Sequence, residues 1–569
     1  MGSVSHLGIC TFSQTLKQLE ASMILFLFVL GCNRFKEQSD IGNFASDHVI
    51  TVDITIDNDD WDALRNQTRT FFSEFTGDCM SEPFYSPYIY YSADITIDDE
   101  SHSNVGIRKK GFLGSQSTDK PSLKINVDEY VAGQNLYGVD NITLNNSVQD
   151  PSLIRQCIGY QLFANAGYPS PQCNFAHVFV NGTDLGIYVH VEPIKRMFLR
   201  THFDEDDGDL YEGTVSDFAP IIYRTFEPKN ENTDTSLEPI FSLKDALEDT
   251  SDLESVLQNH IDVDAFLTFW ALESILNHWD GYAGNRNNYY VYHSRSTDKF
   301  TFIPWGLDDV FDPTSMEEED EPYIFSSGTL ANYILSDAGL TEQLNNKIQL
   351  LMDTVWNEES ILAEIDRMES LLSSETVMSE RTSYIDEIRY FVEERRSYMN
   401  VAPMPEHGPN IPPYCIQEVG SIEASFETQW GTLEDESPTT VGSVDIEMIW
   451  DDTLIEFDQI GSIVGPSDAG PDRDVLLLFG QLGTDYPAYI FPYVDYVRED
   501  AKSGMDIEID SLHTWANVLY TDSSLNYTPI QAAMIHSGTI KFEEYDDTDE
   551  GNVRGYLSTS IYNWREVLE

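Results

Sequence analysis

Positive charge is scarce in this sequence. Its 569 residues include 32 lysines and arginines against 98 aspartates and glutamates, so the formal net charge at pH 7 is −66. A surface this negative repels nucleic-acid phosphates and anionic lipid headgroups. The composition therefore argues against binding to nucleic acid or to an anionic membrane surface through bulk electrostatics. It favours adaptation to high salt, where the repulsion between surface charges is screened.

Cysteine is scarce as well, and none of the six cysteines has the spacing of a zinc site. Apart from Cys10 and Cys32 near the N-terminus, an even number remains: Cys79, Cys157, Cys173 and Cys415. These four are compatible with one or two disulfides in an oxidising compartment. Cys157 with Cys173 is the pair to test first, although the sequence leaves the connectivity open.

The N-terminal apolar run is too short to cross a bilayer as a helix. Residues 23–31 (MILFLFVLG) fall well below the roughly 20 apolar residues of a spanning helix, but they fit the core of a secretory signal. They end in a glycine followed by Cys32, which resembles a bacterial lipobox, in which the cysteine is lipidated and becomes the mature N-terminus. We therefore expect residues 1–32 to be a signal and lipobox segment and residues 33–47 to be a tether. The alternative is an ordinary apolar N-terminus with an incidental cysteine, because Lys17 is the only positive charge of the leader.

These N-terminal features predict the localisation. The protein is expected to be an exported bacterial lipoprotein at the cell envelope or surface. Its contact with the membrane would be made only through the N-terminal lipid anchor, since the charge of the chain disfavours any other.

Proline marks the clearest boundary in the chain. Residues 402–413 (APMPEHGPNIPP) form a Pro-rich stretch, so we expect a linker over residues 401–414. Before it, apolar periodicity predicts a buried helix over residues 264–278 and two further helices between residues 358 and 400. Beyond it, short alternating runs separated by turn residues predict an all-β, sandwich-like accessory domain over residues 415–569.

The most informative segment is residues 277–311, which gathers acids and amides around one hairpin. Aromatic and β-branched runs at residues 289–293 and 300–305 flank a turn-rich stretch, which predicts a β-hairpin. A hairpin brings its outer ends within a few strand spacings of about 5 Å. The polar side chains at these two ends are Asp280, Asn285, Asn287, Asn288, Asp308 and Asp309. Asp, Asn and water supply the oxygen ligands that Mg²⁺ prefers, and Mg²⁺ keeps open positions for substrate phosphates.

The same segment contains a kinase-like pattern. His278-x-Asp280, with Asn285 five residues beyond the aspartate, is similar to the catalytic loop of protein kinases. There the aspartate orients the hydroxyl nucleophile and the asparagine holds metal. The alternative is an Asn- and Gly-rich turn whose side chains only satisfy backbone groups.

Short motifs in a fixed order connect this segment to the rest of residues 48–400. They are Gly106-Ile107-Arg108-Lys109-Lys110-Gly111, Lys120-Pro121-Ser122-Leu123-Lys124-Ile125, Leu144-Asn145-Asn146, Asp150-Pro151-Ser152-Leu153-Ile154-Arg155, Ala166-Gly167-Tyr168-Pro169, Val180-Asn181-Gly182, Gly186-Ile187-Tyr188-Val189, Val191-Glu192 and Leu210-Tyr211-Glu212-Gly213. With residues 277–311 they resemble the CotH-type kinase family, named for spore coat protein H. The resemblance implies an α+β fold, with an atypical protein-kinase-like two-lobed domain over residues 48–400 followed by the all-β domain.

The resemblance also implies a reaction: transfer of the ATP γ-phosphate to Ser or Thr hydroxyls of a protein, with Mg²⁺ or Mn²⁺. Lys124, in an alternating run that predicts a strand, is the first choice for the phosphate-binding lysine, and Lys120 is the second. Glu192 would orient this lysine, and Asp280 would orient or deprotonate the acceptor hydroxyl. The alternative for Lys124 and Glu192 is an ordinary surface ion pair.

The same resemblance implies a metal site at Asn288 and Asp308. Asn285 competes with Asn288, because the kinase-like spacing favours Asn285 and the position directly before the aromatic strand favours Asn288. One position departs from the family pattern: many relatives have Trp-Asp-x-Asp where this chain has Trp305-Gly306-Leu307-Asp308, so the first acid is missing. A kinase is still expected if Asp308 is the essential acid.

Two functions therefore stay open. The first is an exported or surface-anchored protein kinase. Its protein substrate would be basic and Ser-rich, because the acidic run at residues 317–321 could attract it, although such a run is also typical of a solvated loop. The second is a catalytically inactive kinase-fold protein for adhesion or envelope structure, with the β domain as its working part.

Overall fold

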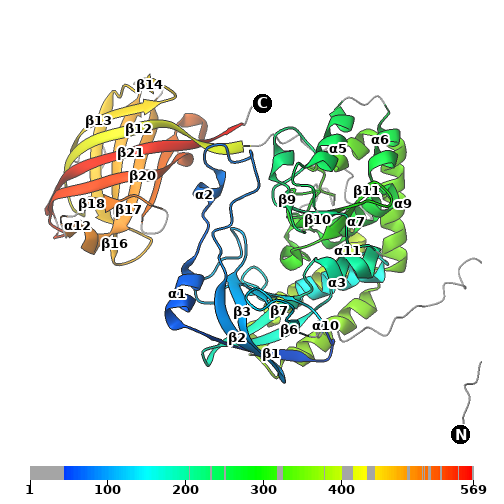
Figure 1. Cartoon of the computed structure of the whole chain (residues 1–569). Helices are drawn as coiled ribbons and strands as arrows, with labels where there is room; N and C mark the ends of the chain where they lie inside the picture. Colours follow the sequence, from blue (N-terminus) through cyan, green and yellow to red (C-terminus); the bar gives the residue numbers. More distant parts are fainter. Residues whose placement is uncertain are drawn as a thin grey trace, which may run out of the picture.

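The computed structural model describes most of the chain between residues 44 and 566. The described residues are 44–136, 138–203, 205–230, 233–248, 252–316, 324–376, 378–399, 414–431, 442–483, 487–502, 504, 506–510, 514–525, 528–548 and 550–566. They form a strand barrel, a helical part around a second sheet, and a C-terminal β domain (Figure 1). The predicted signal segment, most of the tether, the acidic run at 317–321 and the linker up to residue 413 lie outside the described residues.

The first part is a closed barrel with the strand order β1-β2-β3-β4-β5-β7-β6. Its strands are β1 (Val49–Ile56), β2 (Tyr91–Ile97), β3 (Glu100–Lys109), β4 (Leu123–Asn126), β5 (Asn141–Asn145), β6 (Cys173–Val180) and β7 (Thr183–Val191). Alternate residues of each strand fill the interior, as Ile50, Val52 and Ile54 of β1 do. The barrel closes where β1 pairs in parallel with β6. Helix α1 (Asn58–Asn66) follows β1 and contacts β3.

The second part contains a four-stranded sheet in the order β11-β10-β8-β9. β10 (Tyr289–Ser294) and β11 (Lys299–Pro304) form the predicted hairpin, and β10 also pairs with β8 (Asp209–Gly213), which pairs with β9 (Glu227–Pro228). Helix α7 (Val263–Leu276) packs against β11 and is buried from Phe266 to its end, which confirms the helix predicted before the Asp280 loop.

Further helices surround this sheet. They are α3 (Arg155–Asn165), α4 (Arg196–Phe203), α5 (Glu238–Glu248), α6 (Leu253–His260), α8 (Thr329–Ser336), α9 (Ala338–Thr354), α10 (Glu358–Leu372) and α11 (Thr382–Met399). The last two are the pair of helices predicted between residues 358 and 400. α3, α7, α9, α10 and α11 contribute to one apolar core, in which Trp270 is fully buried. No helix in the described part of the chain is both long and apolar enough to cross a membrane.

The C-terminal part is built from strands, as predicted, but as one ten-stranded sheet rather than two packed sheets. It comprises β12 (Tyr414–Gln429), β13 (Ser443–Trp450), β14 (Thr453–Leu454), β15 (Gln459–Pro466), β16 (Arg473–Leu482), β17 (Ala488–Val497), β18 (Asp506–Glu508), β19 (Trp515–Thr521), β20 (Ile530–Tyr545) and β21 (Asn552–Glu566), with a short helix α12 (Arg498–Lys502). The sheet curls until Trp430, directly after β12, bridges to Val464 of β15. Alternation of apolar and polar residues predicts which side chains face inward. This alternation is the same in a sandwich and in a single curled sheet, so it could not distinguish the two.

Two disulfides join the four cysteines. Cys157 of α3 is bonded to Cys173 of β6, which confirms the pair predicted as the first to test. Cys79 is bonded to Cys415 of β12 across a sequence separation of 336 residues. This second bond ties the N-terminal part of the chain to the β domain.

Candidate active site

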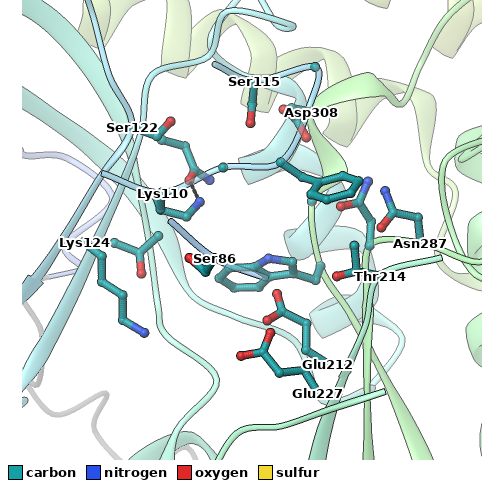
Figure 2. Close-up of a pocket in the computed structure, with 18 of the residues that line it drawn as sticks. Ser86, Lys110, Ser115, Ser122, Lys124, Glu212, Thr214, Glu227, Asn287 and Asp308 are labelled. Atoms are coloured by element: carbon teal, nitrogen blue, oxygen red, sulfur yellow. Dashed lines mark hydrogen bonds between the residues drawn. The ribbon is translucent and has the colours of Figure 1, made fainter. Parts of the chain in front are cut away.

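A cavity of about 260 Å³ lies between the barrel and the second sheet. One wall carries cations of the barrel, Arg108, Lys110 and Lys124, together with the loop at residues 111–115. The opposite wall comes from β8, β9, β10 and the two segments that flank the hairpin, and it includes Glu212, Asp280, Asn287, Asn288 and Asp308. Figure 2 shows Lys110 and Lys124 on one side and Asn287 on the other, with Asp308 at one end and Glu212 and Glu227 at the other.

The lysines of the barrel wall are poised to meet an anion. Lys110 donates a hydrogen bond to Oδ1 of Asn145 (2.5 Å), and its burial lowers its pKa to about 8, against the opposing effect of Asp308. Burial lowers the pKa of Lys124 to about 7, and the nearby Lys195 adds to this effect. Within the described part of the chain, the Lys124 ammonium makes no hydrogen bond or ion pair. An anionic ligand would therefore stabilise the charged form of both side chains.

A buried glutamate shapes the loop that presents Asp280. Helix α7 ends at Asn277, which has a left-handed conformation (φ 58°), and the chain then turns back over the helix. Glu273 of this helix accepts hydrogen bonds from the backbone N–H groups of Tyr282 (2.9 Å) and Ala283 (3.2 Å). A β-carbon at Gly281 would lie 2.2 Å from Oε1 of Glu273, so the turn requires glycine there. These contacts fix the direction in which Asp280 leaves the loop.

Three asparagines surround the Asp280 carboxylate. Nδ2 of Asn285 (2.7 Å), Asn287 (3.2 Å) and Asn288 (2.6 Å) all donate to it. Burial raises the pKa of Asp280, and the amide donors and His278 act against this rise. Asn287 and Asn288 line the cavity with Asp280, whereas Asn285 is absent from the described residues that line it. Asn285 therefore supports the aspartate from outside the cavity, and of the two competing asparagines Asn285 and Asn288 only Asn288 lines it.

Asp308 enters the cavity from a short 3-10 turn, η2 (Leu307–Asp309), that follows β11. Helix α3 packs against this turn at Gly159. The packing is so close that a β-carbon at Gly159 would lie 2.9 Å from Cδ1 of Leu307. Burial raises the pKa of Asp308 to about 6; Lys110 opposes this rise, and Asp150 and Asp280 add to it. The neighbouring Asp309 instead accepts a hydrogen bond from Nε1 of Trp279 (2.6 Å).

The Asn288 amide occupies the space beside Gly306 where a side chain at position 306 would begin. Gly306 has a left-handed conformation (φ 57°), and a β-carbon there would lie 2.4 Å from Oδ1 of Asn288. The backbone N–H of Trp305 also donates to the carbonyl oxygen of Asn288 (3.2 Å). A side chain at position 306 could therefore be accommodated only if the Asn288 amide moved.

This crowding predicts that Gly306→Asp destabilises the protein instead of restoring an acid. The change combines a left-handed side-chain residue, which costs about 1 kcal/mol, with a clash against Asn288. Gly182→Asp is the matched control, because Gly182 has φ +78° and nothing within 4 Å of its β-carbon position. Denaturant unfolding should show a loss of about 2–4 kcal/mol for Gly306→Asp and about 1 kcal/mol for the control. Equal losses in the two variants would contradict this packing.

The oxygen atoms around Asp308 suit a hard cation. Asp308 and Asn288 both line the cavity, and a carboxylate and an amide oxygen are the donor chemistry of Mg²⁺ or Mn²⁺. No cluster of three or more His, Cys, Asp or Glu side chains with metal-binding geometry occurs in the described part of the chain. A cation here would therefore take further ligands from water and from a phosphate group, as Mg²⁺ sites commonly do.

Comparison with known proteins decides the family. The family model described as CotH kinase protein matches residues 107–400, just over half of the chain and all of the cavity's hairpin and lysines. The chain belongs to the CotH kinase protein family. The family resemblance predicted from the motifs is thereby confirmed.

Curated relatives of this CotH-family chain come from a bacterium and a fungus. It is 25% identical over 300 residues to Inner spore coat protein H of Bacillus subtilis, covering 48% of this chain and 82% of that protein. It is 22% identical to Invasin CotH2 of Rhizopus delemar, covering 39% of this chain and 43% of that one, and 20% identical to Invasin CotH7, covering 52% of each. The chain thus spans only about half the length of the two fungal relatives.

A solved structure was also found. It is the crystal structure of a Helicobacter pylori proinflammatory kinase, CtkA, at 11% identity and a TM-score of 0.28, covering 52% of this chain and 93% of that one. A TM-score this low carries no argument about how the parts of the CotH-family chain are arranged.

Two of the predicted site residues lie away from the cavity. Lys120 donates through Nζ to the carbonyl oxygen of Ile187 (2.7 Å) and lies over the Tyr188 ring. Glu192 accepts a hydrogen bond from the backbone N–H of Gln172 (3.0 Å), and neither it nor Lys120 is among the described residues that line the cavity. The predicted pairing of Glu192 with Lys124 is therefore not formed in this structure.

Among the acids that line the cavity, the one whose charge raises the pKa of Lys124 is Glu212, which was not predicted as a site residue. Lys229 binds the Glu212 carboxylate (2.5 Å) and keeps its pKa low despite burial. Lys110 was missed as well, although its motif was recognised. In the structure Lys110 directly follows β3 and precedes Gly111, where the chain turns with φ 116°.

Proposed function

We propose that this protein is an atypical protein kinase that transfers the γ-phosphate of ATP to Ser or Thr hydroxyls of a protein substrate. One observation carries the proposal: barrel lysines face Asp280, Asn288 and Asp308 across a single cavity. Membership of the CotH kinase protein family supports it. The barrel would act as one lobe of a kinase-like domain and the helical part with its sheet as the other.

The cavity offers each part that phosphoryl transfer needs. Lys110 and Lys124 would bind the phosphate oxygens, which gives a role to two half-buried lysines with lowered pKa values. Asp308 and Asn288 would hold Mg²⁺ or Mn²⁺, which supplies further positive charge to the phosphate oxygens. The barrel lysines and Asp308 would thus bind the same metal–ATP complex, the lysines through its phosphates and Asp308 through its metal ion.

Asp280 would aim the acceptor hydroxyl. Held by three amides, its carboxylate can accept a hydrogen bond from the hydroxyl and orient the oxygen toward the γ-phosphorus. As the new O–P bond forms, the bond to the bridging oxygen of ADP breaks, and the hydroxyl proton passes to Asp280 or to solvent. The raised pKa of Asp280 is suited to this proton transfer.

Export and substrate choice remain part of the proposal. The predicted lipoprotein signal and the acidic run at residues 317–321 lie outside the described residues. We propose a basic, Ser-rich protein substrate on the strength of the charge of −66. The signal and lipobox pattern supports a location at the cell envelope.

Label transfer from ATP tests the function directly. The purified full-length chain is incubated with γ-labelled ATP and Mg²⁺ or Mn²⁺, with itself and a basic Ser-rich protein as acceptors. We expect metal-dependent labelling of protein and an ATP-induced rise in melting temperature. No labelling and no such rise would overturn the kinase proposal and favour a non-catalytic surface protein.

A further inference from the structure

A segment of the N-terminal part lies against the β domain. We call residues 68–88 the strap; it contains helix α2 (Phe71–Phe75), which sits beside β12 and β21 in Figure 1. The Cys79–Cys415 disulfide joins the strap to β12, and Thr76 forms an isolated parallel β-bridge with Ile416, the residue after Cys415. Both Cys415 and Ile416 are buried. This contact is therefore an integral part of the fold.

Aromatic rings extend the contact from the strap to strands β20 and β21. The ring of Phe72 stacks on His536, with centroids 3.5 Å apart, and meets Tyr562 edge-on at 4.6 Å. The ring of Phe75 meets Trp564 at 5.5 Å. Aromatic pairs of this kind stabilise a contact beyond the area that they bury. The β domain thus contacts the strap through aromatic side chains and is bonded to it through the disulfide.

The other face of the strap holds the cavity loop, residues 111–116. Phe112 of this loop packs against Phe84 (5.4 Å between ring centroids) and Phe75 (6.5 Å), and the Arg69 guanidinium lies over its ring at 5.2 Å. Phe75 therefore contacts both the β domain and the cavity loop.

Hydrogen bonds add to this hold on the loop. Oε1 of Gln116 accepts from the backbone N–H of Arg69 (2.8 Å) and from the Tyr88 hydroxyl (3.1 Å), while its Nε2 donates to the Arg69 carbonyl oxygen (2.7 Å). Arg69, Tyr88 and residues 111–115 all line the cavity. The strap and loop therefore form one wall of the cavity, fixed from outside by the β domain.

We propose that the β domain is a positioning element of the active site, acting through the strap on the loop at residues 111–116. The inference rests on the proposed function in assigning this cavity to ATP. Phe112 and Leu113 are half-buried, and both pack on the cluster that the strap and the β domain share. Without the contacts from the β domain these side chains lose part of their packing, so the loop next to Lys110 becomes more mobile.

Trp564 supplies the sharper of two test variants. Trp564→Ala removes the ring that meets Phe75, and its 39% exposure limits the damage to the β domain. Tyr556→Ala is the matched control, because Tyr556 is an aromatic residue of the same strand with 48% exposure. Cys79→Ser/Cys415→Ser is the second variant, since it removes the disulfide without leaving either of its two cysteines as a free thiol. Melting temperatures establish that each variant is folded.

Hydrogen exchange without nucleotide measures the effect on the loop. We expect the backbone amide of Arg69, which joins the strap to Oε1 of Gln116 in the loop, to exchange about tenfold faster in both test variants and at the wild-type rate in Tyr556→Ala. Unchanged exchange in folded forms of both test variants would overturn the proposal. This measurement needs no ATP. If exchange changes as expected but the protein shows no kinase activity, the proposed function is overturned and the link between the β domain and the loop still stands.

Kinetics then separate positioning from general stability. If the strap positions the loop on the phosphates, the KM for ATP should rise about tenfold in Trp564→Ala while kcat changes by less than about threefold. A loss of stability alone would lower the active fraction, and thus the apparent kcat, without changing KM. That second pattern would contradict a positioning role.

Discussion

Asp280→Asn should abolish phosphoryl transfer while leaving ATP affinity nearly unchanged. The substitution keeps the size of the side chain but removes its charge and replaces an acceptor oxygen with an amide nitrogen. Asn285, Asn287 and Asn288 all point donors at this group, and an introduced amide, which has one acceptor oxygen, cannot accept from all three. Loss of the residue that orients and deprotonates the hydroxyl costs about 10²–10⁴-fold in rate. Label transfer gives the rate, and the ATP-induced change in melting temperature gives the affinity.

Asp298→Asn is the control for this variant. Asp298 lies in the turn of the same hairpin, where its side chain is 92% exposed, so the charge of the chain changes equally without a change in the cavity. A wild-type rate in Asp280→Asn would overturn the assignment of Asp280. Loss of ATP binding together with transfer would instead place Asp280 on the phosphates or on the metal.

The site residues that sequence could predict are those linked by local structure. A hairpin needs only a short turn between two runs, so the meeting of the Asp280 loop with Asp308 follows from neighbouring residues. Lys124 follows from the alternation of a strand, in which Leu123 and Ile125 face inward and the lysine faces the other way. The family resemblance added roles to these positions but no contacts.

The choice between Glu192 and Glu212 depended on long-range pairing. Both acids lie near the end of an aromatic or β-branched strand, so their local patterns are alike. β7 is a strand of the barrel wall, paired with β5 and β6. β8 instead pairs with the hairpin, and its Glu212 lines the cavity. Pairings between distant strands set which acid reaches the site, and no local pattern in the sequence reports them.

The barrel and the disulfide to the β domain were beyond local reasoning for the same reason. Closure rests on β1 pairing with β6, which joins Val52 to Val178. The Cys157–Cys173 bond spans 16 residues, whereas Cys79–Cys415 spans 336. Alternation showed that residues beyond 415 form strands, but it could not show that their sheet would press against the cavity loop through the strap.

Asp308→Asn should abolish metal-dependent nucleotide binding, which is a different loss from that expected at Asp280. Asp308 is the acid that lines the cavity beside Lys110, and an amide there would weaken the hold on a divalent cation. At an ATP concentration of about 100 times Kd, binding stabilises the folded wild type by about 2.7 kcal/mol, which raises its melting temperature by several degrees. We expect this rise, measured with Mg²⁺ present, to disappear in Asp308→Asn.

Asp309→Asn is the matched control, because Asp309 is the next residue and bonds to Trp279 instead of lining the cavity. It should keep the metal-dependent rise. Equal ATP affinity with and without metal in the wild type would show that Asp308 and Asn288 do not act as a metal clamp. Gly306 sharpens this test, since position 306 of this chain carries no acid that could replace Asp308. A chain that retains binding and transfer without Asp308 would need a different site for its chemistry.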